Sequence, residues 1–275
     1  MAITLVTTTK GPIVAKKWVL ILGASSGFGA SAAKAFAADG YNIFGVHLDR
    51  SSTLSNAEDV TREVIASGSE CHFFNVNAAD DARRAEVLSE IQDILNQKGG
   101  EVQVLLHSLA FGSLLPFISE EGQRGLSGKQ MTMTLEVMGN SLVWWTRDLV
   151  AKKLLSSGGR VFAMTSSGSH SAFHAYGAVG AAKAALESHV RYLAMELAPK
   201  KISVNAILAG VTDTPALRKI PGHTTLLANA LEKNPSGRLT QCEDVAACLV
   251  ALSRAGTAWL TGNTLRVDGG ESICS

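Results

Sequence analysis

Short apolar runs alternate with helical sequence along almost the whole chain. Each run holds four to six residues that are mostly apolar or β-branched. The runs are residues 18–22, 42–46, 71–74, 102–106, 160–164, 202–207 and 264–267. Strands that are apolar on both faces, with helices between them, are typical of a parallel sheet covered on both sides. We therefore predict an α/β fold with one doubly wound domain over residues 1–275, built on a seven-stranded parallel sheet with helices on both faces.

The composition excludes several classes of partner. Acidic and basic side chains nearly cancel, at 24 against 25, which argues against a nucleic acid or an anionic membrane as partner. No apolar stretch has the length of a membrane span, and residues 1–17 lack the features of a signal peptide. The four cysteines are Cys71, Cys242, Cys248 and Cys274. They show no C-x-x-C spacing, so neither a zinc site nor a redox motif is indicated. We expect a cytoplasmic protein without a metal ion.

A glycine-rich turn follows the first predicted strand. The sequence Gly23-Ala-Ser-Ser-Gly-Phe-Gly29 has the spacing G-x3-G-x-G and leads into a helix predicted over about residues 29–38. Glycines let the backbone approach a pyrophosphate closely, and the N-terminus of the helix supplies free N–H groups. This turn predicts a dinucleotide-binding (Rossmann) domain. The cofactor would be held there by Gly23, Ser25, Ser26, Gly27, Phe28 and Gly29.

Tyr176 and Lys183 have a spacing that suits reduction chemistry. Positions i and i+7 of an α-helix point the same way, about 10 Å apart along the axis. Tyrosine can donate a proton, and lysine can hold sugar hydroxyls and lower the pKa of the tyrosine. Lys183 lies among alanines at positions 181, 182, 184 and 185 instead of on a charged face. We predict that both residues are catalytic and that Lys183 also binds the ribose of the cofactor.

These motifs, with Asn205-Ala206 and the closing segment 267–270, resemble the short-chain dehydrogenase/reductase superfamily over almost the whole chain. The resemblance implies that Asn75 and Val76 lie against the adenine and that Thr214 contacts the pyrophosphate. It also implies cofactor contacts for Ser108, Leu109, Ala110 and Gly210.

The position of the tyrosine narrows the resemblance. Most short-chain reductases that act on carbonyls place tyrosine four residues before the lysine, where this chain has Val179, and carry a serine at the position of Ser166. The Tyr-x6-Lys pattern is instead similar to the enoyl-acyl-carrier-protein reductases. Segments 106–112, 213–217 and 234–238 resemble this family too, the last two most closely its third, short-chain-like bacterial type. The resemblance implies reduction of the 2,3-double bond of an enoyl thioester in fatty-acid synthesis, with Ser166 in the catalytic set and acyl carrier protein as a possible partner.

Reduction of an enoyl thioester gives a physical reason for the displaced tyrosine. Hydride adds to the β-carbon while negative charge develops on a carbonyl oxygen two carbons away, so the acid must stand farther from the nicotinamide. A displacement of three residues along a helix is about 4.5 Å. Two alternatives stay open: a carbonyl or hydroxyl oxidoreductase acting on a 3-oxoacyl thioester or another ketone, and a non-catalytic nucleotide-binding sensor.

The end of the second predicted strand carries both determinants of cofactor choice. Asp49 would accept from the ribose hydroxyls of NAD, whereas Arg50 would pair with the 2′-phosphate of NADP. In many NAD-using relatives the acidic residue falls two positions earlier, at His47 in this chain. We therefore predict NADPH, with NADH as the alternative.

Two further segments have a texture of their own. Residues 214–237 carry three prolines with leucines between them, and a long insertion after a strand is where a substrate lid is expected. The helix predicted over residues 176–198 is apolar nearly all round, which indicates burial by the sheet on one side and by a partner subunit on the other. We expect a homotetramer or a homodimer.

Overall fold

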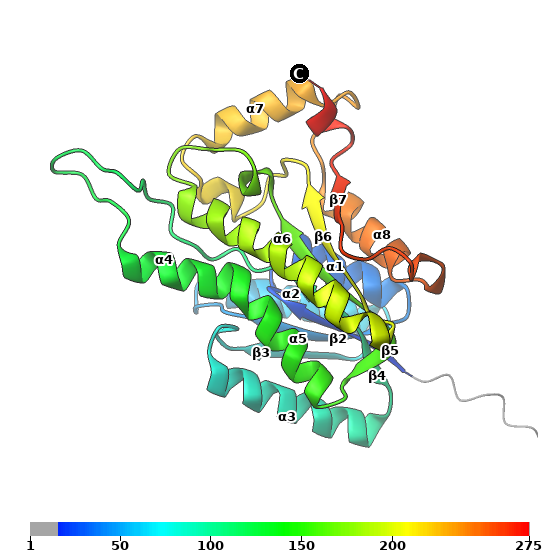
Figure 1. The fold of residues 1–275 in the computed structure, drawn as a ribbon. Coiled ribbons are helices and arrows are strands. Elements are labelled where there is room, and N and C mark those ends of the chain that lie inside the picture. Colours follow the sequence, from blue (N-terminus) through cyan, green and yellow to red (C-terminus); the bar gives the residue numbers. More distant parts are fainter. Residues whose placement is uncertain (1–15, 275) are drawn as a thin grey trace, which may run out of the picture.

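The computed structural model describes residues 16–274. Residues 1–15 and 275, at the two ends of the predicted domain, lie outside the described residues, as does most of the segment considered for a signal peptide. Seven strands form one parallel sheet in the order β3-β2-β1-β4-β5-β6-β7 (Figure 1). The strands are β1 Lys17–Leu22, β2 Asn42–His47, β3 Cys71–Asn75, β4 Glu101–His107, β5 Leu155–Thr165, β6 Ser203–Ala209 and β7 Thr264–Val267. The predicted fold class is confirmed.

Helices cover both faces of the sheet (Figure 1). One face packs against α3 (Asp81–Lys98), α5 (Ser141–Ala151) and α6 (Gly177–Leu197). The other packs against α1 (Gly27–Ala38), α2 (Leu54–Ala66) and α8 (Cys242–Leu252). Two helices remain: α4 (Gly128–Leu135), which a π-helical turn over Glu136–Asn140 joins to α5 and which packs against α6, and α7 (His223–Lys233).

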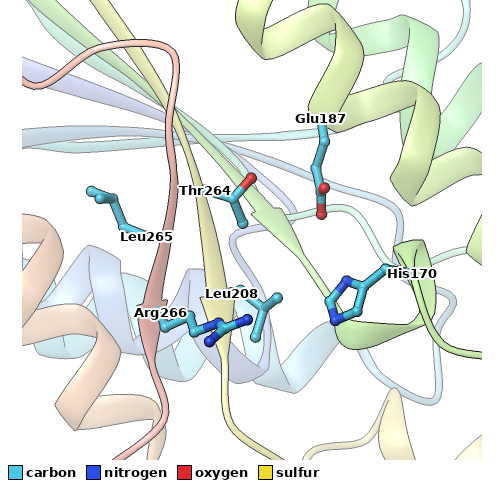
Figure 2. Close-up of a pocket in the computed structure, with 6 residues that line it drawn as sticks. All are labelled: His170, Glu187, Leu208, Thr264, Leu265 and Arg266. Carbon is cyan, nitrogen blue, oxygen red and sulfur yellow. The ribbon is translucent and has the colours of Figure 1, made fainter. Parts of the chain in front are cut away.

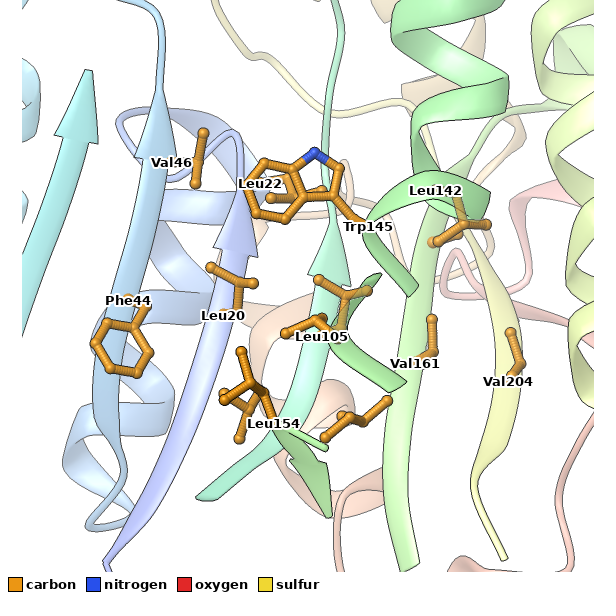
Figure 3. Close-up of a cluster of buried hydrophobic side chains, with 14 of the residues drawn as sticks. Leu20, Leu22, Phe44, Val46, Leu105, Leu142, Trp145, Leu154, Val161 and Val204 are labelled. Atoms are coloured by element: carbon orange, nitrogen blue, oxygen red, sulfur yellow. The ribbon is translucent and has the colours of Figure 1, made fainter. Parts of the chain in front are cut away.

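The core follows from strands that bury both faces. Trp18, Leu20 and Leu22 of β1 point into the cluster under α3, α5 and α6, where Trp145 of α5 also lies (Figure 3). Val19 and Ile21 alternate with them and point into the cluster under α1, α2 and α8. Because successive side chains of a strand point to opposite faces, an apolar run of this kind supplies two core layers at once.

The strand order places the functional motifs at one edge. The chain leaves β1 toward β2 and returns to place β4 on the other side of β1. Ligands of such sheets bind beyond the carboxyl ends of the strands, at the point where the strand order reverses. The glycine turn, Ser108, Ser166 and Gly210 all follow the ends of strands that lie side by side. Within residues 16–274, no helix is long and apolar enough to cross a membrane.

Candidate active site

The glycines of the turn leave the N-terminus of α1 free of obstructing side chains. The N–H groups of Gly23 and Ala24 donate to the carbonyl oxygen of Val46 at 2.8 and 3.0 Å, which ties the turn to β2. Gly23 has φ +89°, and a Cβ on Gly29 would lie 1.9 Å from the Gly23 oxygen, so neither position accepts a side chain without a shift. The helix begins after Ser26 without a side-chain cap. Free N–H groups at such an end suit a pyrophosphate.

Thr214 lies over this turn. A Cβ built on Gly27 would lie 3.6 Å from its Cγ2 atom, and its hydroxyl accepts a hydrogen bond from the N–H of Leu217 at 3.2 Å. The structure thus brings Thr214 next to the turn to which the sequence analysis assigned it, although nearly two hundred residues separate them in the chain. Ser25 and Phe28 are half-buried in the turn and Ser26 is exposed.

The ends of β4 and β6 carry the next predicted cofactor residues, and the end of β4 borders the turn. The carbonyl oxygen of Ser108 would lie 2.5 Å from a Cβ on Gly23, so the two backbones are in close contact. Leu109 packs against the core and Ala110 is exposed. Gly210 donates its N–H to Val267 at 3.1 Å, and a Cβ there would meet the Thr240 hydroxyl at 2.3 Å. Ser108, Leu109 and Thr214 therefore lie against the glycine turn, whereas the neighbours of Gly210 are Thr240, Glu271 and Asp268.

The residues predicted to bind the adenosine lie at the ends of β2 and β3. The Asp49 N–H donates to Asn75 Oδ1 at 3.0 Å, and Asn75 Nδ2 donates to the Asp49 carbonyl oxygen at 3.0 Å. Val76 is buried behind them, and the Arg50 side chain is exposed. Burial raises the pKa of Asp49, but hydrogen bonds with Ser25, Thr53 and His47 outweigh this and hold the pKa below its ordinary value.

Tyr176, Ser166 and Lys183 lie together at the start of α6. Tyr176 is the residue that precedes the helix, and its hydroxyl shares a 3.2 Å hydrogen bond with the Ser166 hydroxyl at the end of β5. Lys183 is 5% exposed, and its ammonium donates to the carbonyl oxygen of Met164 at 2.7 Å. Val179 is buried in an apolar cluster against which Tyr176 packs. The arrangement offers one phenol and one ammonium, with no donor at the Val179 position.

Burial controls the protonation of both groups. Burial lowers the pKa of Lys183 to about 8, with Glu187 acting in the opposite direction. Burial also raises the pKa of Tyr176, although the hydrogen bond with Ser166 lowers it in part. The sequence analysis expected Lys183 to lower the pKa of Tyr176. In the structure burial raises this pKa and Ser166, not Lys183, acts against it, so Tyr176 stays protonated and able to donate at neutral pH.

Aromatic residues that the sequence analysis did not identify surround Tyr176. The ring of Phe117 would lie 2.5 Å from a Cβ on Gly177, so it covers the first residue of α6. Phe173 packs edge-to-face on Tyr176 with ring centroids 5.9 Å apart. Both rings are partly exposed, at 57% and 37%. Exposed aromatic rings beside a polar donor suit an acyl group. The sequence did not identify them, because exposure is decided by the folded structure.

A pocket lies outside the residues of the predicted site. It has a volume of about 510 Å³ and is lined by residues of β6, β7, α6 and the turn after β5, as Figure 2 shows. None of its six lining residues belongs to the predicted site: they are His170, Glu187, Leu208, Thr264, Leu265 and Arg266. We therefore identify the candidate active site by the reactive side chains around Tyr176 and not by the volume of this pocket. Among residues 16–274 no group of three or more His, Cys, Asp or Glu is placed to hold a metal ion.

Comparison with known proteins assigns these features to a family. Residues 23–272 match the family described as enoyl-(acyl carrier protein) reductase. The chain belongs to this enoyl reductase family. It is therefore an oxidoreductase, and the resemblance stated from the motifs is confirmed at that level. A nicotinamide nucleotide is its cofactor class, in agreement with relatives whose names specify NADPH or NADH.

Three similar proteins illustrate the range of the family. The 1-cyclohexenylcarbonyl-CoA reductase of Streptomyces collinus is 32% identical over 259 residues, covering 92% of this chain and 86% of the relative. An enoyl-(acyl-carrier-protein) reductase (NADPH) of Staphylococcus aureus is 29% identical over 201 residues, covering 73% of this chain and 75% of the relative. The solved structure of the enoyl-(acyl-carrier-protein) reductase (NADH) of Aquifex aeolicus has a TM-score of 0.79 and 25% identity, covering 95% and 98% of the two chains.

Proposed function

We propose that the protein reduces the 2,3-double bond of enoyl thioesters with a reduced nicotinamide nucleotide. The observation that carries the proposal is the placement of the single phenol: Tyr176 contacts Ser166 at 3.2 Å, whereas the position one turn closer to Lys183 is the buried Val179. An acid at Tyr176 suits charge that develops on an oxygen remote from the carbon that is reduced. The two alternatives, reduction of a carbonyl and a non-catalytic sensor, receive no comparable support.

The roles of the side chains follow from their positions. When bound, the reduced nicotinamide would supply a hydride for the β-carbon. Tyr176 donates a hydrogen bond to the thioester carbonyl oxygen as charge develops there, and Ser166 orients the phenol. Lys183 holds the ribose hydroxyls from its buried position. The α1 N-terminus and Thr214 hold the pyrophosphate, while Phe117 and Phe173 exclude water from the acyl group.

The choice between NADPH and NADH rests on Asp49 and Arg50. The sequence analysis predicted NADPH because the acidic residue lies two positions beyond its usual place and Arg50 follows it, and relatives of both types occur. The position of Asp49 favours NADH, because its carboxylate is held by His47 at 2.8 Å, just beyond the strand end to which the glycine turn is bound, and would repel a 2′-phosphate there. Arg50 is exposed and forms no ion pair with any residue between 16 and 274. We therefore propose NADH as the preferred nucleotide.

The carrier and the assembly belong to the same proposal. One relative is named for a coenzyme A ester and another for acyl carrier protein, so both carriers are candidates, and fatty-acid synthesis in the cytoplasm is the proposed setting. Residues 214–237 are proposed as the lid: α7 buries only Ala230, while Leu226 and Leu227 are half-buried. Exposed apolar residues on α6, Tyr192 and Met195, support association into a homodimer or homotetramer.

One experiment with the unmutated protein tests the proposed reaction. Crotonyl and acetoacetyl thioesters, each on coenzyme A and on acyl carrier protein, are compared by following oxidation of NADH and NADPH. We expect kcat/KM for crotonyl thioester to exceed that for acetoacetyl thioester. Faster reduction of acetoacetyl thioester would show that the position of Tyr176 does not select the conjugated double bond, and the proposal would fail. No oxidation of either nucleotide with any of these thioesters, despite tight nucleotide binding, would support the sensor.

A further inference from the structure

Asp49 is held in place by contacts to both its backbone and its side chain. Its backbone forms two reciprocal hydrogen bonds of 3.0 Å with the amide of Asn75 at the end of β3. Its carboxylate oxygen Oδ2 lies 2.8 Å from Nδ1 of His47, and the two side chains are only 10% and 4% exposed. An ionised carboxylate only accepts hydrogen bonds, so Nδ1 of His47 carries the proton in this pair. A surface aspartate would not need so many partners.

The place where Asp49 is held faces the glycine turn. The turn is bound to the end of β2 through the two hydrogen bonds from Gly23 and Ala24 to Val46. The Val76 N–H donates to the carbonyl oxygen of His47 at 2.8 Å, which brings β3 to the same point. Ser25 of the turn helps to lower the pKa of the Asp49 carboxylate, so the two residues are neighbours. A ribose whose pyrophosphate lies on the turn would therefore have its hydroxyls beside this carboxylate.

We infer that His47 and Asn75 are positioning residues that hold the Asp49 carboxylate at the ribose and thereby select NADH over NADPH. The inference rests on the proposed function only in assuming that a nicotinamide dinucleotide binds on the glycine turn. The carboxylate lies two residues beyond the position expected of an acid in this strand, and the buried imidazole of His47 occupies that position instead. The imidazole holds the displaced carboxylate through the 2.8 Å contact between Nδ1 and Oδ2.

Arg50 does not cancel this effect. Its side chain is exposed, and its carbonyl oxygen accepts a hydrogen bond from the Thr53 N–H at 2.9 Å, which begins the turn into α2. The backbone therefore leads away from the ribose directly after Asp49. The negative charge of Asp49 is balanced in place only by hydrogen bonds from His47, Ser25 and Thr53, and it stays available to accept from ribose hydroxyls and to repel a phosphate.

The test measures dissociation constants of NADH and NADPH by isothermal titration calorimetry, without acyl substrate. In the unmutated protein we expect NADH to bind more tightly. Asp49→Asn should reduce the ratio of the NADPH dissociation constant to the NADH dissociation constant about tenfold, because the variant loses one charge-assisted contact with NADH and one repulsion of NADPH. His47→Leu and Asn75→Ala should reduce the ratio in the same direction, and His47→Gln, which keeps a donor, should restore part of it. The matched control is Leu48→Ala. Leu48 lies between His47 and Asp49 in the sequence, but its side chain is 61% exposed, so this variant should leave the ratio unchanged.

A double variant separates positioning from general damage. If His47 acts through Asp49, His47→Leu with Asp49→Asn should have the same nucleotide ratio as Asp49→Asn alone. Equal weakening of both nucleotides by His47→Leu, or additive effects in the double variant, would overturn the inference, as would tighter binding of NADPH by the unmutated protein. If His47→Leu does not fold, Asn75→Ala and His47→Gln decide the outcome. If neither nucleotide binds, the proposed function is overturned as well. If NADH and NADPH bind equally tightly to the unmutated protein and enoyl reduction is intact, only this inference is overturned.

Discussion

At the scale of single residues, burial determines what the two reactive side chains can do. Tyr176 keeps its proton because burial raises its pKa, and Lys183 stays protonated at pH 7 although burial lowers its pKa to about 8. The residue before the tyrosine, Ala175, has φ +58°, which is an uncommon conformation for a residue with a side chain and adds strain next to the site. The buried charge of Lys183 and the backbone conformation of Ala175 therefore both lower the stability of the free protein.

Removal of the phenol tests the role of Tyr176. Tyr176→Phe keeps the ring contacts with Phe173 but loses the donor, so we expect kcat on crotonyl thioesters to fall about 10²–10³-fold. The dissociation constant of the nucleotide should stay nearly unchanged, because Tyr176 is assigned to the acyl oxygen. Steady-state kinetics and fluorescence titration measure the two quantities. Ser166→Ala should lower kcat less, and a Tyr176→Phe enzyme with near-normal kcat would contradict the assignment.

Replacement of Lys183 should stabilise the protein without ligand. A folded-state pKa of about 8 against an ordinary 10.5 means that protonated Lys183 destabilises the fold, by about 3 kcal/mol below pH 8. This cost disappears as pH rises from 8 toward 10.5, where both states become neutral. Lys183→Met also loses the hydrogen bond to Met164, at about 1 kcal/mol. We expect the free energy of unfolding at pH 7 to rise by about 2 kcal/mol.

Urea denaturation at pH 7 and at pH 10 measures this effect. The advantage of Lys183→Met should shrink between the two pH values, while nucleotide binding weakens at both. A variant that is less stable than the unmutated protein at pH 7 would show that Lys183 is better solvated or paired than its burial indicates.

At the scale of elements, the segments around the site differ in how firmly they are packed. Helix α6 buries ten of its residues, including Val179 and Lys183, so the reactive groups lie on a rigid support. Helix α7 buries one residue, Ala230, and leaves Leu231 48% exposed. Its end is anchored by Asn234, which donates to the Asp268 carbonyl oxygen at 3.0 Å. A helix with an anchored end and a poorly buried face is suited to move over a ligand.

Limited proteolysis tests the lid. Trypsin should cleave the free protein after Arg218, Lys219 or Lys233, which are exposed on the segment around α7, before it cleaves elsewhere in residues 16–274. Nucleotide together with an enoyl thioester should slow these cleavages at least several-fold, because closure buries the leucines. Cleavage at Lys98, at the end of α3, serves as the internal control and should not change. Equal rates with and without ligands would favour a helix that is packed permanently.

At the scale of the whole molecule, apolar residues remain uncovered on one side. Tyr192 and Met195 of α6 are 61% and 65% exposed, and Trp259 is 98% exposed. The segment after Trp259 lies close to this part of α6, since a Cβ on Gly262 would be 3.6 Å from the Cβ of Ala194. Large apolar side chains that gather on one side of a protein often mark an interface.

Charge introduced on this side should change the oligomeric state. Met195→Lys and Tyr192→Glu would place charges in an apolar contact between subunits, which costs several kcal/mol. We expect analytical ultracentrifugation to show a dimer or tetramer for the unmutated protein and a smaller species for the variants. Ile65→Lys, on the exposed side of α2, is the matched control and should leave the mass unchanged. A monomeric unmutated protein would contradict the expected association.

Most of the fold was predictable because its pattern is local. The apolar runs placed all seven strands within a few residues of their observed bounds, except that β5 begins five residues earlier than the predicted start at 160 and ends one residue later. The glycine turn was predictable for the same reason, since its spacing, the strand before it and the helix after it are adjacent in the chain. The π-helical turn over Glu136–Asn140 and helix α7 inside the predicted lid were not identified.

By itself, the sequence determined the sheet, the position of the glycine turn and the seven-residue separation of Tyr176 and Lys183, because each depends on neighbouring residues. Only the tertiary structure decided how these groups behave. It held the Asp49 carboxylate through His47 and the Asp49 backbone through Asn75, which lies 26 residues later, and it brought Phe117 onto Gly177. It also buried Lys183 and Tyr176 enough to shift both pKa values. Contacts between distant residues and the loss of solvent depend on packing, which local patterns do not specify.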